Sequence, residues 1–244
     1  MEDIVNTKTN VYSVEPGTLY IVGTPIGNLM DMTIRAIEVL RSVDIVLAED
    51  TRRTSKLLKS YNISTKLITF NEHSSNKKVE EIISVLKSGK SVALVSDAGM
   101  PIVSDPGAKL VRNCREQGLK VQVIPGPSAL TSAVAVCGLS GTHFYFVGFM
   151  PRDKKRRRFL KRLKECDLIH TVVFFESPER LRKTLEDILS ILGDVEICIA
   201  RELTKVYEEV FCGTVSQALV HFKEPLGEIT VVLKTGRDNS DVED

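Results

Sequence analysis

The sequence predicts an α/β protein built from two α/β domains, and three observations support this fold class. Short apolar runs alternate with segments of helical spacing along most of the 244 residues, as in repeated strand–helix units. The first five apolar runs are continuous, which suits a parallel sheet covered on both faces. After residue 139 strand signals follow one another more directly, which indicates more antiparallel pairing. We expect an N-terminal domain at 17–127 and a C-terminal domain at 128–236, joined near 125–128 without a low-complexity linker.

In the N-terminal half, each expected helix has its own signal. Ile34, Ile37 and Leu40 have helical spacing, and Gly89 and Gly118 are favoured residues just after a helix end. The predicted strands are 19–22, 44–50, 66–70, 91–97 and 120–126, and the predicted helices are 32–43, 78–89, 106–118 and 127–139.

In the C-terminal half, a very basic helix follows the strand-like run HFYFVGFMP. A helix from Pro178 to Leu192 begins with proline, which is favoured in a first turn. The remaining predicted strands are 171–177, 196–202, 207–215 and 227–236, with a helix between the last two.

Composition sets limits on the function. A net charge of +1 gives no global signal for nucleic acid, so any such signal must be local. Five cysteines without a CxxC pair favour reduced thiols in a cytoplasmic protein over disulfides or a metal site. No signal peptide or membrane-spanning run is evident, and we expect flexible tails at 1–16 and 237–244, the second acidic.

Polar or glycine-rich loops follow all five N-terminal strands. They are GTPIGNL (23–29), AEDTRR (48–53), FNEHS (70–74), SDAGMPIVSDPG (96–107) and PGPSA (125–129). In open α/β sheets, ligands bind outside the carboxyl ends of the strands, so these loops predict a binding site. The first loop is not GxGxxG, and its proline lacks an amide that a pyrophosphate would need. A dinucleotide site is therefore disfavoured.

Several long motifs occur in the order and spacing of one family. They are GTLYIVGTPIGNLMDMTIRAIEVL, AEDTRRTSKLL, LVSDAGMPIVSDPG, PGPSA, GFMP, FFESPERL and ARELTK, and they span about 17–236. The chain resembles the ribosomal RNA small-subunit methyltransferase I family of the tetrapyrrole-methylase superfamily. The resemblance implies two α/β domains of the tetrapyrrole-methylase type, with S-adenosylmethionine in the cleft between them. It also implies methylation of a cytidine 2′-hydroxyl in the decoding region of 16S rRNA, action on the 30S subunit, and a homodimer.

Two features depart from the family pattern. Met100 stands where many members have threonine, and many members carry a further C-terminal helical segment.

The resemblance also implies a set of cofactor residues. A glycine such as Gly99 permits close approach of the backbone to a ligand, and an acid such as Asp97 suits a cationic sulfonium. The implied residues are Pro25, Asp97, Ala98, Gly99, Ile102, Ser128, Ala129, Phe149, Met150, Ala200, Gly227, Glu228 and Ile229.

Some of these motifs have purely structural explanations. Asp97 is also a possible turn cap, and Ala200 an ordinary core alanine. Ser177 and Pro178 of FFESPER are a typical helix start, and we expect Asp105 to be the N-cap of the helix that begins at PGAKLV.

Methyl transfer to a 2′-hydroxyl favours a general base, because the hydroxyl is a poor nucleophile. The candidates are Asp50, His73 and Glu202, with Glu49 and Lys205 beside them in the same motifs. The alternatives are that Asp50 caps the next helix and that His73 is an ordinary surface or core histidine.

The local nucleic-acid signal is the run of nine basic residues between 152 and 164. Cations beside a cofactor site can orient RNA through its phosphates, although a charge run is also typical of a solvated face. Few aromatic residues interrupt the run, so base stacking is not evident. The RNA-binding candidates are Arg52, Arg53, Arg156, Arg157, Arg158, Lys161 and Arg162.

Three functions are compatible with this pattern: an rRNA 2′-O-methyltransferase, a methylase of a small tetrapyrrole-like substrate, and a non-catalytic ribosome-binding protein. The basic helix, AEDTRR and RELTK disfavour the second. The intact DAGMP and PGPSA loops disfavour the third.

Overall fold

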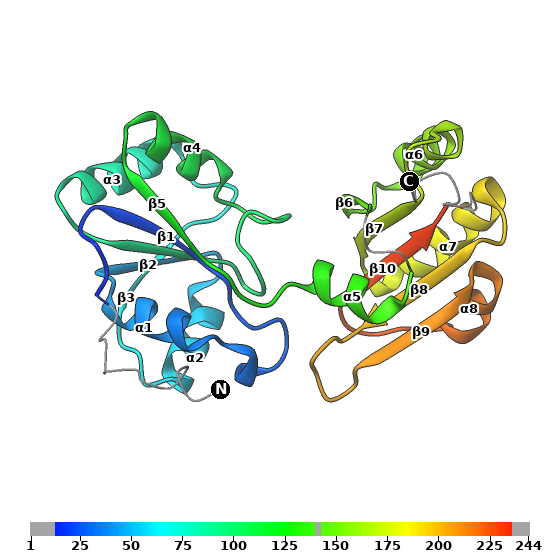
Figure 1. Cartoon of the computed structure of the whole chain (residues 1–244), viewed down its shortest axis with the longest axis horizontal. Coiled ribbons are helices and arrows are strands. Elements are labelled where there is room, and N and C mark those ends of the chain that lie inside the picture. Colours follow the sequence, from blue (N-terminus) through cyan, green and yellow to red (C-terminus); the bar gives the residue numbers. More distant parts are fainter. Residues whose placement is uncertain (1–12, 140–142, 236–244) are drawn as a thin grey trace, which may run out of the picture. The chain divides into compact units, whose positions relative to one another are not determined.

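The computed structural model describes residues 13–139 and 143–235, and the chain divides into unit 1, Met1–Pro127, and unit 2, Ser128–Asp244 (Figure 1). Most of the predicted N-terminal tail (1–16) and the whole predicted acidic tail (237–244) lie outside the described residues. Each unit has its own hydrophobic core and its own five-stranded sheet.

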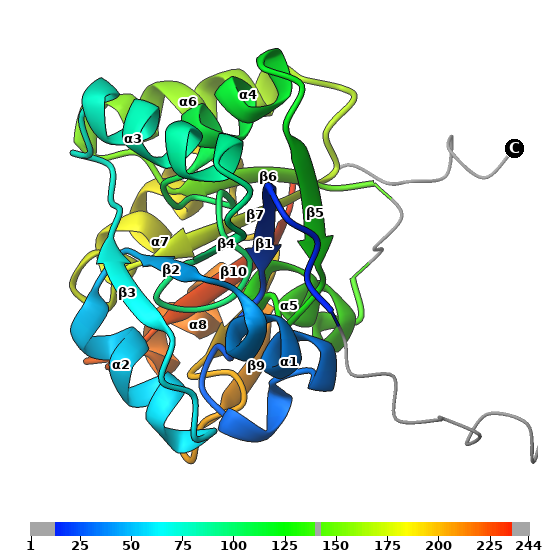
Figure 2. The ribbon, with the colours of Figure 1, turned by 90° about the vertical axis from the view of Figure 1, so that its left-hand side faces the viewer.

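Unit 1 is built on a sheet in which all strand pairs are parallel. Its strands are β1 (Thr18–Val22), β2 (Ile45–Ala48), β3 (Lys66–Thr69), β4 (Val92–Val95) and β5 (Lys120–Ile124). Their order is β3-β2-β4-β1-β5, with β1 and β4 side by side at the centre (Figure 2). β1, β2 and β4 are buried along their whole length, which explains their continuous apolar sequences.

Helices cover both faces of this sheet. The 3-10 helix η1 (Leu29–Asp31) precedes α1 (Ile34–Ser42), and α1 and α2 (Thr51–Ser60) pack on the face to which Tyr20 and Val22 point. The opposite face, to which Leu19 and Ile21 point, is covered by α3 (Asn76–Lys87) and α4 (Ala108–Glu116). Alternate residues of one buried strand therefore serve two separate cores.

Unit 2 has a mixed sheet, as the sequence predicts. Its strands are β6 (Tyr145–Phe149), β7 (Thr171–Glu176), β8 (Glu196–Arg201), β9 (Glu209–Thr214) and β10 (Ile229–Lys234), in the order β6-β7-β10-β8-β9. Only the β6–β7 pair is parallel, and the other three pairs are antiparallel. The two units are thus both α/β but differ in strand direction.

The helices of unit 2 are divided unequally between the faces of its sheet. α5 (Ala129–Cys137) contacts β7, β8, β9 and β10 on one face. On the other face α6 (Asp153–Glu165), α7 (Pro178–Leu192) and α8 (Val215–His221) form a core with Phe174, Ile199 and Val231. The observed bounds of α7 are those predicted from the sequence.

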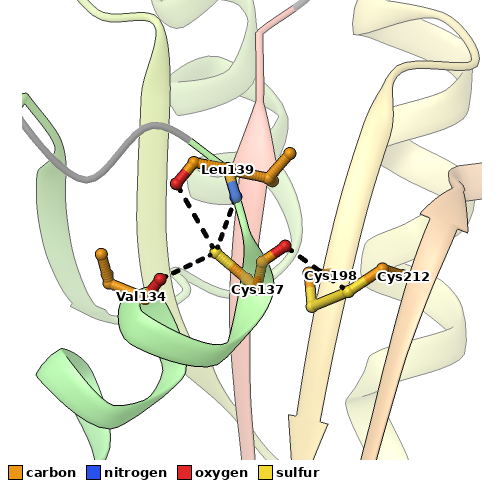
Figure 3. The surroundings of a disulfide bond; sticks show 5 residues. All are labelled: Val134, Cys137, Leu139, Cys198 and Cys212. Atoms are coloured by element: carbon orange, nitrogen blue, oxygen red, sulfur yellow. Dashed lines mark hydrogen bonds between the residues drawn. A yellow bond between two sulfur atoms is a disulfide. The ribbon is translucent and has the colours of Figure 1, made fainter.

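The expectation of reduced cysteines is wrong at one pair. Cys198 and Cys212 lie directly opposite each other in the β8–β9 ladder, with Cα atoms 4.2 Å apart, and form a disulfide (Figure 3). The carbonyl oxygen of Cys137, at the end of α5, lies 3.7 Å from the sulfur of Cys212. Cys114, Cys137 and Cys166 are free thiols.

The predicted cap of α4 is also wrong. The helix begins at Ala108 with Gly107 as its N-cap, two residues after Asp105. Gly107 has φ +130°, and a Cβ there would lie 2.6 Å from Leu94 Cδ2. Only glycine fits this position without strain, so the turn before the helix is made at Gly107 and not at Asp105. Asp105 is left in the loop.

Candidate functional site

The loops after β1, β4 and β5 are joined at the carboxyl edge of the sheet in unit 1. Thr24 and Gly99 exchange two backbone hydrogen bonds, of 2.9 and 3.1 Å, and the amide of Gly23 donates to Ile124. A Cβ on Gly23 would lie 2.7 Å from the Cα of Gly126, so both positions require glycine for the loops to approach this closely. The predicted clustering of these loops is therefore present within the unit.

Asp97 links this group of loops to the loop after β2. One carboxylate oxygen accepts a hydrogen bond of 3.1 Å from the amide of Asp50, and the other lies 3.2 Å from the guanidinium of Arg53. The side chain is 24% exposed, so it remains accessible to a ligand. Asp97 both orders the loop and presents negative charge at its surface.

Two further acids, Glu49 and Asp105, lie in the same electrostatic environment. Burial raises the pKa of Asp105 to about 6, the neighbouring Glu49 adds to the rise, and a hydrogen bond from Ser96 opposes it. Burial and then Asp97 raise the pKa of Glu49. These shifts follow from desolvation and like charges. The edge of unit 1 therefore carries excess negative charge, which suits a cationic ligand.

The sequence interpretation assigned Asp105 to a helix cap and did not include it among the candidate site residues. Asp105 is the second acid of the loop SDAGMPIVSDPG, which could have indicated a role at this edge of the sheet. Pro106 directly after it favoured the interpretation as a helix cap.

The structure shows that Asp50 caps a helix and that His73 lies in an exposed turn. Asp50 caps α2: its carboxylate accepts from the amide of Arg52 at 2.8 Å and from the Arg52 guanidinium at 2.8 and 3.1 Å. These hydrogen bonds hold the pKa of Asp50 far below its ordinary value, which makes it a weak base. His73 has an 85% exposed side chain in the turn after the edge strand β3, where its ring lies 3.4 Å from Glu72.

Glu202, the third candidate, lies in unit 2 in a tightly bonded loop. Its carboxylate accepts from Lys205 at 2.7 Å and from the amide of Glu228 at 2.9 Å, and the Lys205 hydrogen bond lowers its pKa. Lys205 also donates to Glu228 at 3.1 Å. Glu202 and Thr204 have φ values of +52° and +68°, which are uncommon for residues with side chains. The RELTK motif thus forms a strained, internally paired loop.

The other predicted cofactor residues fall into two groups. Pro25, Ala98, Ser128 and Ala129 are half-buried, as is Ile102, whose φ of +76° is unusual for a β-branched residue. In unit 2 Met150, Ala200 and Ile229 are buried in the fold, whereas Phe149, Gly227 and Glu228 are exposed. The burial of Ala200 agrees with its alternative role as a core alanine.

Arg156 corrects the prediction for the basic helix. Its side chain is 3% exposed, and its Nη2 and Nε atoms lie 2.6 and 2.8 Å from Asp187. Its Nη1 donates to Thr184 at 3.2 Å. It cannot bind an RNA phosphate from this position, because its donors are directed into the unit. The other predicted RNA-binding residues, Arg52, Arg53, Arg157, Arg158, Lys161 and Arg162, are exposed.

Within 13–139 and 143–235, no group of three or more histidine, cysteine or acidic residues is arranged to hold a metal ion. Over the same part of the chain, no helix combines the length and apolarity that crossing a membrane requires.

Solved structures define the fold class. Uroporphyrin-III-C-methyltransferase from Thermus thermophilus superimposes with a TM-score of 0.61 at 20% identity, covering 90% of this chain and 94% of that one. A diphthine synthase gives a TM-score of 0.68 at 18% identity, covering 89% of each chain. The fold is that of the tetrapyrrole methylases.

The chain belongs to the Tetrapyrrole (Corrin/Porphyrin) Methylases family, whose sequence profile matches residues 18–219, and within it to the relatives named Ribosomal RNA small subunit methyltransferase I. The relative from Thermotoga maritima is 60% identical over 89% of this chain and 98% of its own length. Those from Halalkalibacterium halodurans and Bacillus subtilis are each 45% identical, over 76% and 78% of their lengths. The resemblance noted in the sequence is confirmed.

Proposed function

We propose that this protein is an S-adenosylmethionine-dependent methyltransferase that modifies the 2′-hydroxyl of a cytidine in the decoding region of 16S rRNA. The observation that carries the proposal is the 60% identity, over nearly all of both chains, to a relative named as a small-subunit rRNA methyltransferase. The matched region covers 89% of this chain and 98% of the relative, so it takes in parts of both units.

Unit 1 has features that fit the proposed cofactor. Gly99, with φ +78°, is buried, and its two backbone hydrogen bonds with Thr24 fix the course of the loop that carries Asp97. Asp97, Glu49 and Asp105 supply negative charge for a ligand that carries both a sulfonium and an ammonium group. We propose that other residues also contact the cofactor, on the resemblance to the family. In unit 1 they are Pro25, Ala98, Ile102, Ser128 and Ala129, and in unit 2 they are Phe149, Met150, Ala200, Gly227, Glu228 and Ile229.

The cofactor, when bound, supplies the methyl group from its sulfonium, and the sulfur leaves as a neutral thioether. The protein has to position the ribose hydroxyl and accept its proton. Asp50 and Glu202 are poorly suited to accept it, because hydrogen bonds stabilise their ionised forms. Asp105 is a better base, since a group with a pKa of about 6 is ionised at pH 7 and still retains proton affinity.

The RNA-binding role is proposed for exposed cations. Arg157, Arg158, Lys161 and Arg162 on α6, and Arg52 and Arg53 at the start of α2, are accessible to phosphates. We propose the assembled 30S subunit as substrate, a homodimer as the active form and the cytoplasm as its location, all on the resemblance to the family.

The decisive experiment uses S-adenosylmethionine labelled in its methyl group. We expect label in 16S rRNA when the protein is incubated with purified 30S subunits from a strain that lacks the modification. Resistance of one internucleotide bond to alkaline hydrolysis would locate the methyl group on a 2′-oxygen. A parallel incubation uses a tetrapyrrole precursor in place of the 30S subunits. Label in the precursor alone would select a small-molecule methylase, and label in neither substrate would leave a non-catalytic ribosome-binding protein.

Asp97 provides a separate test of the cofactor site. Replacing Asp97 by Asn keeps its shape but removes its charge, and we expect calorimetric titration to show S-adenosylmethionine affinity at least about tenfold weaker. Glu80→Gln, an exposed position on α3, is the control for a change of one charge and should bind as the native protein does. Equal affinity of the two variants would exclude Asp97 from the site.

A further inference from the structure

The proposed methyl transfer gives no role to FFESPER, the segment at the end of β7 and the start of α7. This segment forms one wall of a cavity of about 420 Å³ in unit 2. The other wall is the N-cap and first turn of α6. The cavity is lined by Arg152, Asp153, Arg156, Ser177, Glu179, Arg180 and Lys183.

Four of the seven lining residues are cations and two are acids, so the lining is positive. The two inner cations are already paired: Arg156 with buried Asp187, and Arg180 with the fully buried carboxylate of Glu176 at 3.1 Å. Thr184 connects the two pairs, because it accepts from Arg156 and donates to Glu176 at 2.6 Å. These contacts fix the floor of the cavity.

The two outer cations are available to a ligand. Arg152 is exposed, and its guanidinium makes no hydrogen bond or ion pair to any residue in the described part of the chain. Lys183 is 65% exposed and reaches Glu186 at 3.2 Å, a contact that solvent weakens. Both side chains can therefore turn to an anion in the cavity at little cost.

Backbone donors add to the positive potential. α6 and α7 both begin at this cavity, and neither N-cap residue, Arg152 or Ser177, caps its helix with a side-chain hydrogen bond. Pro178 has no N–H, and the amides of Lys155 and Arg180 donate to the carbonyls of the N-cap residues at 3.0 and 3.1 Å. The positive ends of both helix dipoles nevertheless lie beside the cavity. This supports the choice of an anion as ligand, which the basic lining already indicates.

We propose that this cavity binds a phosphate group of the RNA backbone. The proposal rests on the proposed function for the identity of the RNA, but the anion chemistry stands on the lining residues. RNA is favoured over a free anion because the exposed cations of α6 continue directly from the cavity and can follow the next phosphates of a strand.

The floor of the cavity connects a bound phosphate to the loop that the family resemblance assigns to the cofactor. Nη2 of Arg180 donates to the carbonyl of Met150, and also to that of Pro151 at 3.2 Å. Arg180 therefore orders the end of β6 from the side of the cavity. A phosphate held by Arg152 and Lys183 would be fixed relative to this loop, which would orient the RNA within unit 2.

The test compares two double variants with the same loss of charge. Arg152→Ala/Lys183→Ala removes the two outer cations of the cavity. Lys77→Ala/Lys90→Ala removes two exposed cations from unit 1 that lie far from it in sequence and carry no side-chain ion pair in the described chain. Both pairs are exposed, so both variants should fold, and circular dichroism with urea unfolding confirms this.

Binding to 30S subunits is measured at several salt concentrations. We expect the cavity variant to bind about tenfold more weakly than the Lys77/Lys90 control. We also expect its slope of log affinity against log salt to be flatter by about 0.7–0.9. Calorimetric affinity for S-adenosylmethionine should be equal in both variants. Affinity and slope equal to those of the control would overturn the proposal.

A second arm separates this proposal from the proposed function. If the native protein neither binds nor methylates 30S subunits, the proposed function fails and thermal unfolding with inorganic phosphate decides the cavity. A ligand that binds only the folded state raises the melting temperature, so phosphate should stabilise the native protein and the control more than the cavity variant. Equal stabilisation of all three would refute the anion site.

Discussion

Replacing Arg156 by Ala should destabilise unit 2 strongly, although Arg156 belongs to a run of basic residues that looks solvent-exposed in the sequence. Its guanidinium makes three short contacts to Asp187 and Thr184, and the side chains of Arg156 and Asp187 are 3% and 6% exposed. Removing one partner of a buried ion pair leaves the other charge uncompensated and costs about 3–5 kcal/mol. We expect about 3 kcal/mol, because Arg157, at 3.5 Å from Asp187, would retain part of the attraction.

Urea unfolding followed by circular dichroism measures this loss. With a urea dependence of about 1–3 kcal/mol/M, a loss of about 3 kcal/mol lowers the midpoint by about 1 M or more. Arg158→Ala, two residues along the same helix and exposed, is the matched control and should change stability by no more than about 0.5 kcal/mol. The double variant Arg156→Met/Asp187→Leu removes both charges and should recover most of the loss.

Equal midpoints for Arg156→Ala and Arg158→Ala would refute this reasoning, because they would mean that the Arg156 guanidinium is solvated. The same pair of variants also separates folding from RNA binding. Arg158→Ala should weaken binding to 30S subunits without loss of stability, whereas any binding defect of Arg156→Ala should follow its unfolding.

Three further predictions concern other parts of the molecule. The pKa of Asp105 is raised to about 6 in the folded state, so the folded protein binds this proton more tightly than the unfolded chain does. The resulting stabilisation is fully present below the unfolded pKa of about 4 and is lost as the pH rises through 6. The stability of Asp105→Asn relative to the native protein should therefore increase as the pH rises from 4 to 7.5. A difference in unfolding midpoint that stays constant across this range would contradict the raised pKa of Asp105. Gly107→Ala should cost more than about 1 kcal/mol, because a Cβ there meets Leu94, whereas Gly118→Ala, also at positive φ but with open space around it, should cost less; the two unfolding midpoints decide. Thiol labelling of the unfolded, unreduced protein should count three free thiols, and a count of five would exclude the Cys198–Cys212 disulfide.

The elements of the fold could be predicted because local sequence and burial agree in them. Strands such as β4 are apolar throughout, since both of their faces are covered, and α7 combines helical spacing with proline in its first turn. The order of strands could not be predicted, because it depends on which apolar surfaces meet in three dimensions. No single residue records that β10 lies between β7 and β8.

The loops of the candidate site were predictable where backbone geometry demands a residue type. Gly23, Gly99 and Gly126 lie in loops that the sequence identified, at positions where the backbone approaches closely or φ is positive. Side-chain roles were less predictable, because they depend on partners distant in sequence. Arg156 forms a buried ion pair with Asp187, 31 residues further along the chain. The pKa of Asp105 is raised by burial and by the neighbouring Glu49.

The central position of β10 has a consequence for synthesis of the protein. Unit 1 has all of its strands once Ile124 has emerged from the ribosome, so it can fold early. Unit 2 cannot close its sheet at that stage, because β6–β7 and β8–β9 are joined only through β10, whose residues 229–234 are translated last among its strands. Until then the nascent chain presents two strand pairs with open, apolar edges, the kind of surface that aggregates or recruits chaperones. A chain truncated before Ile229 should therefore leave unit 1 folded and attached to a second half that has no way to complete its core.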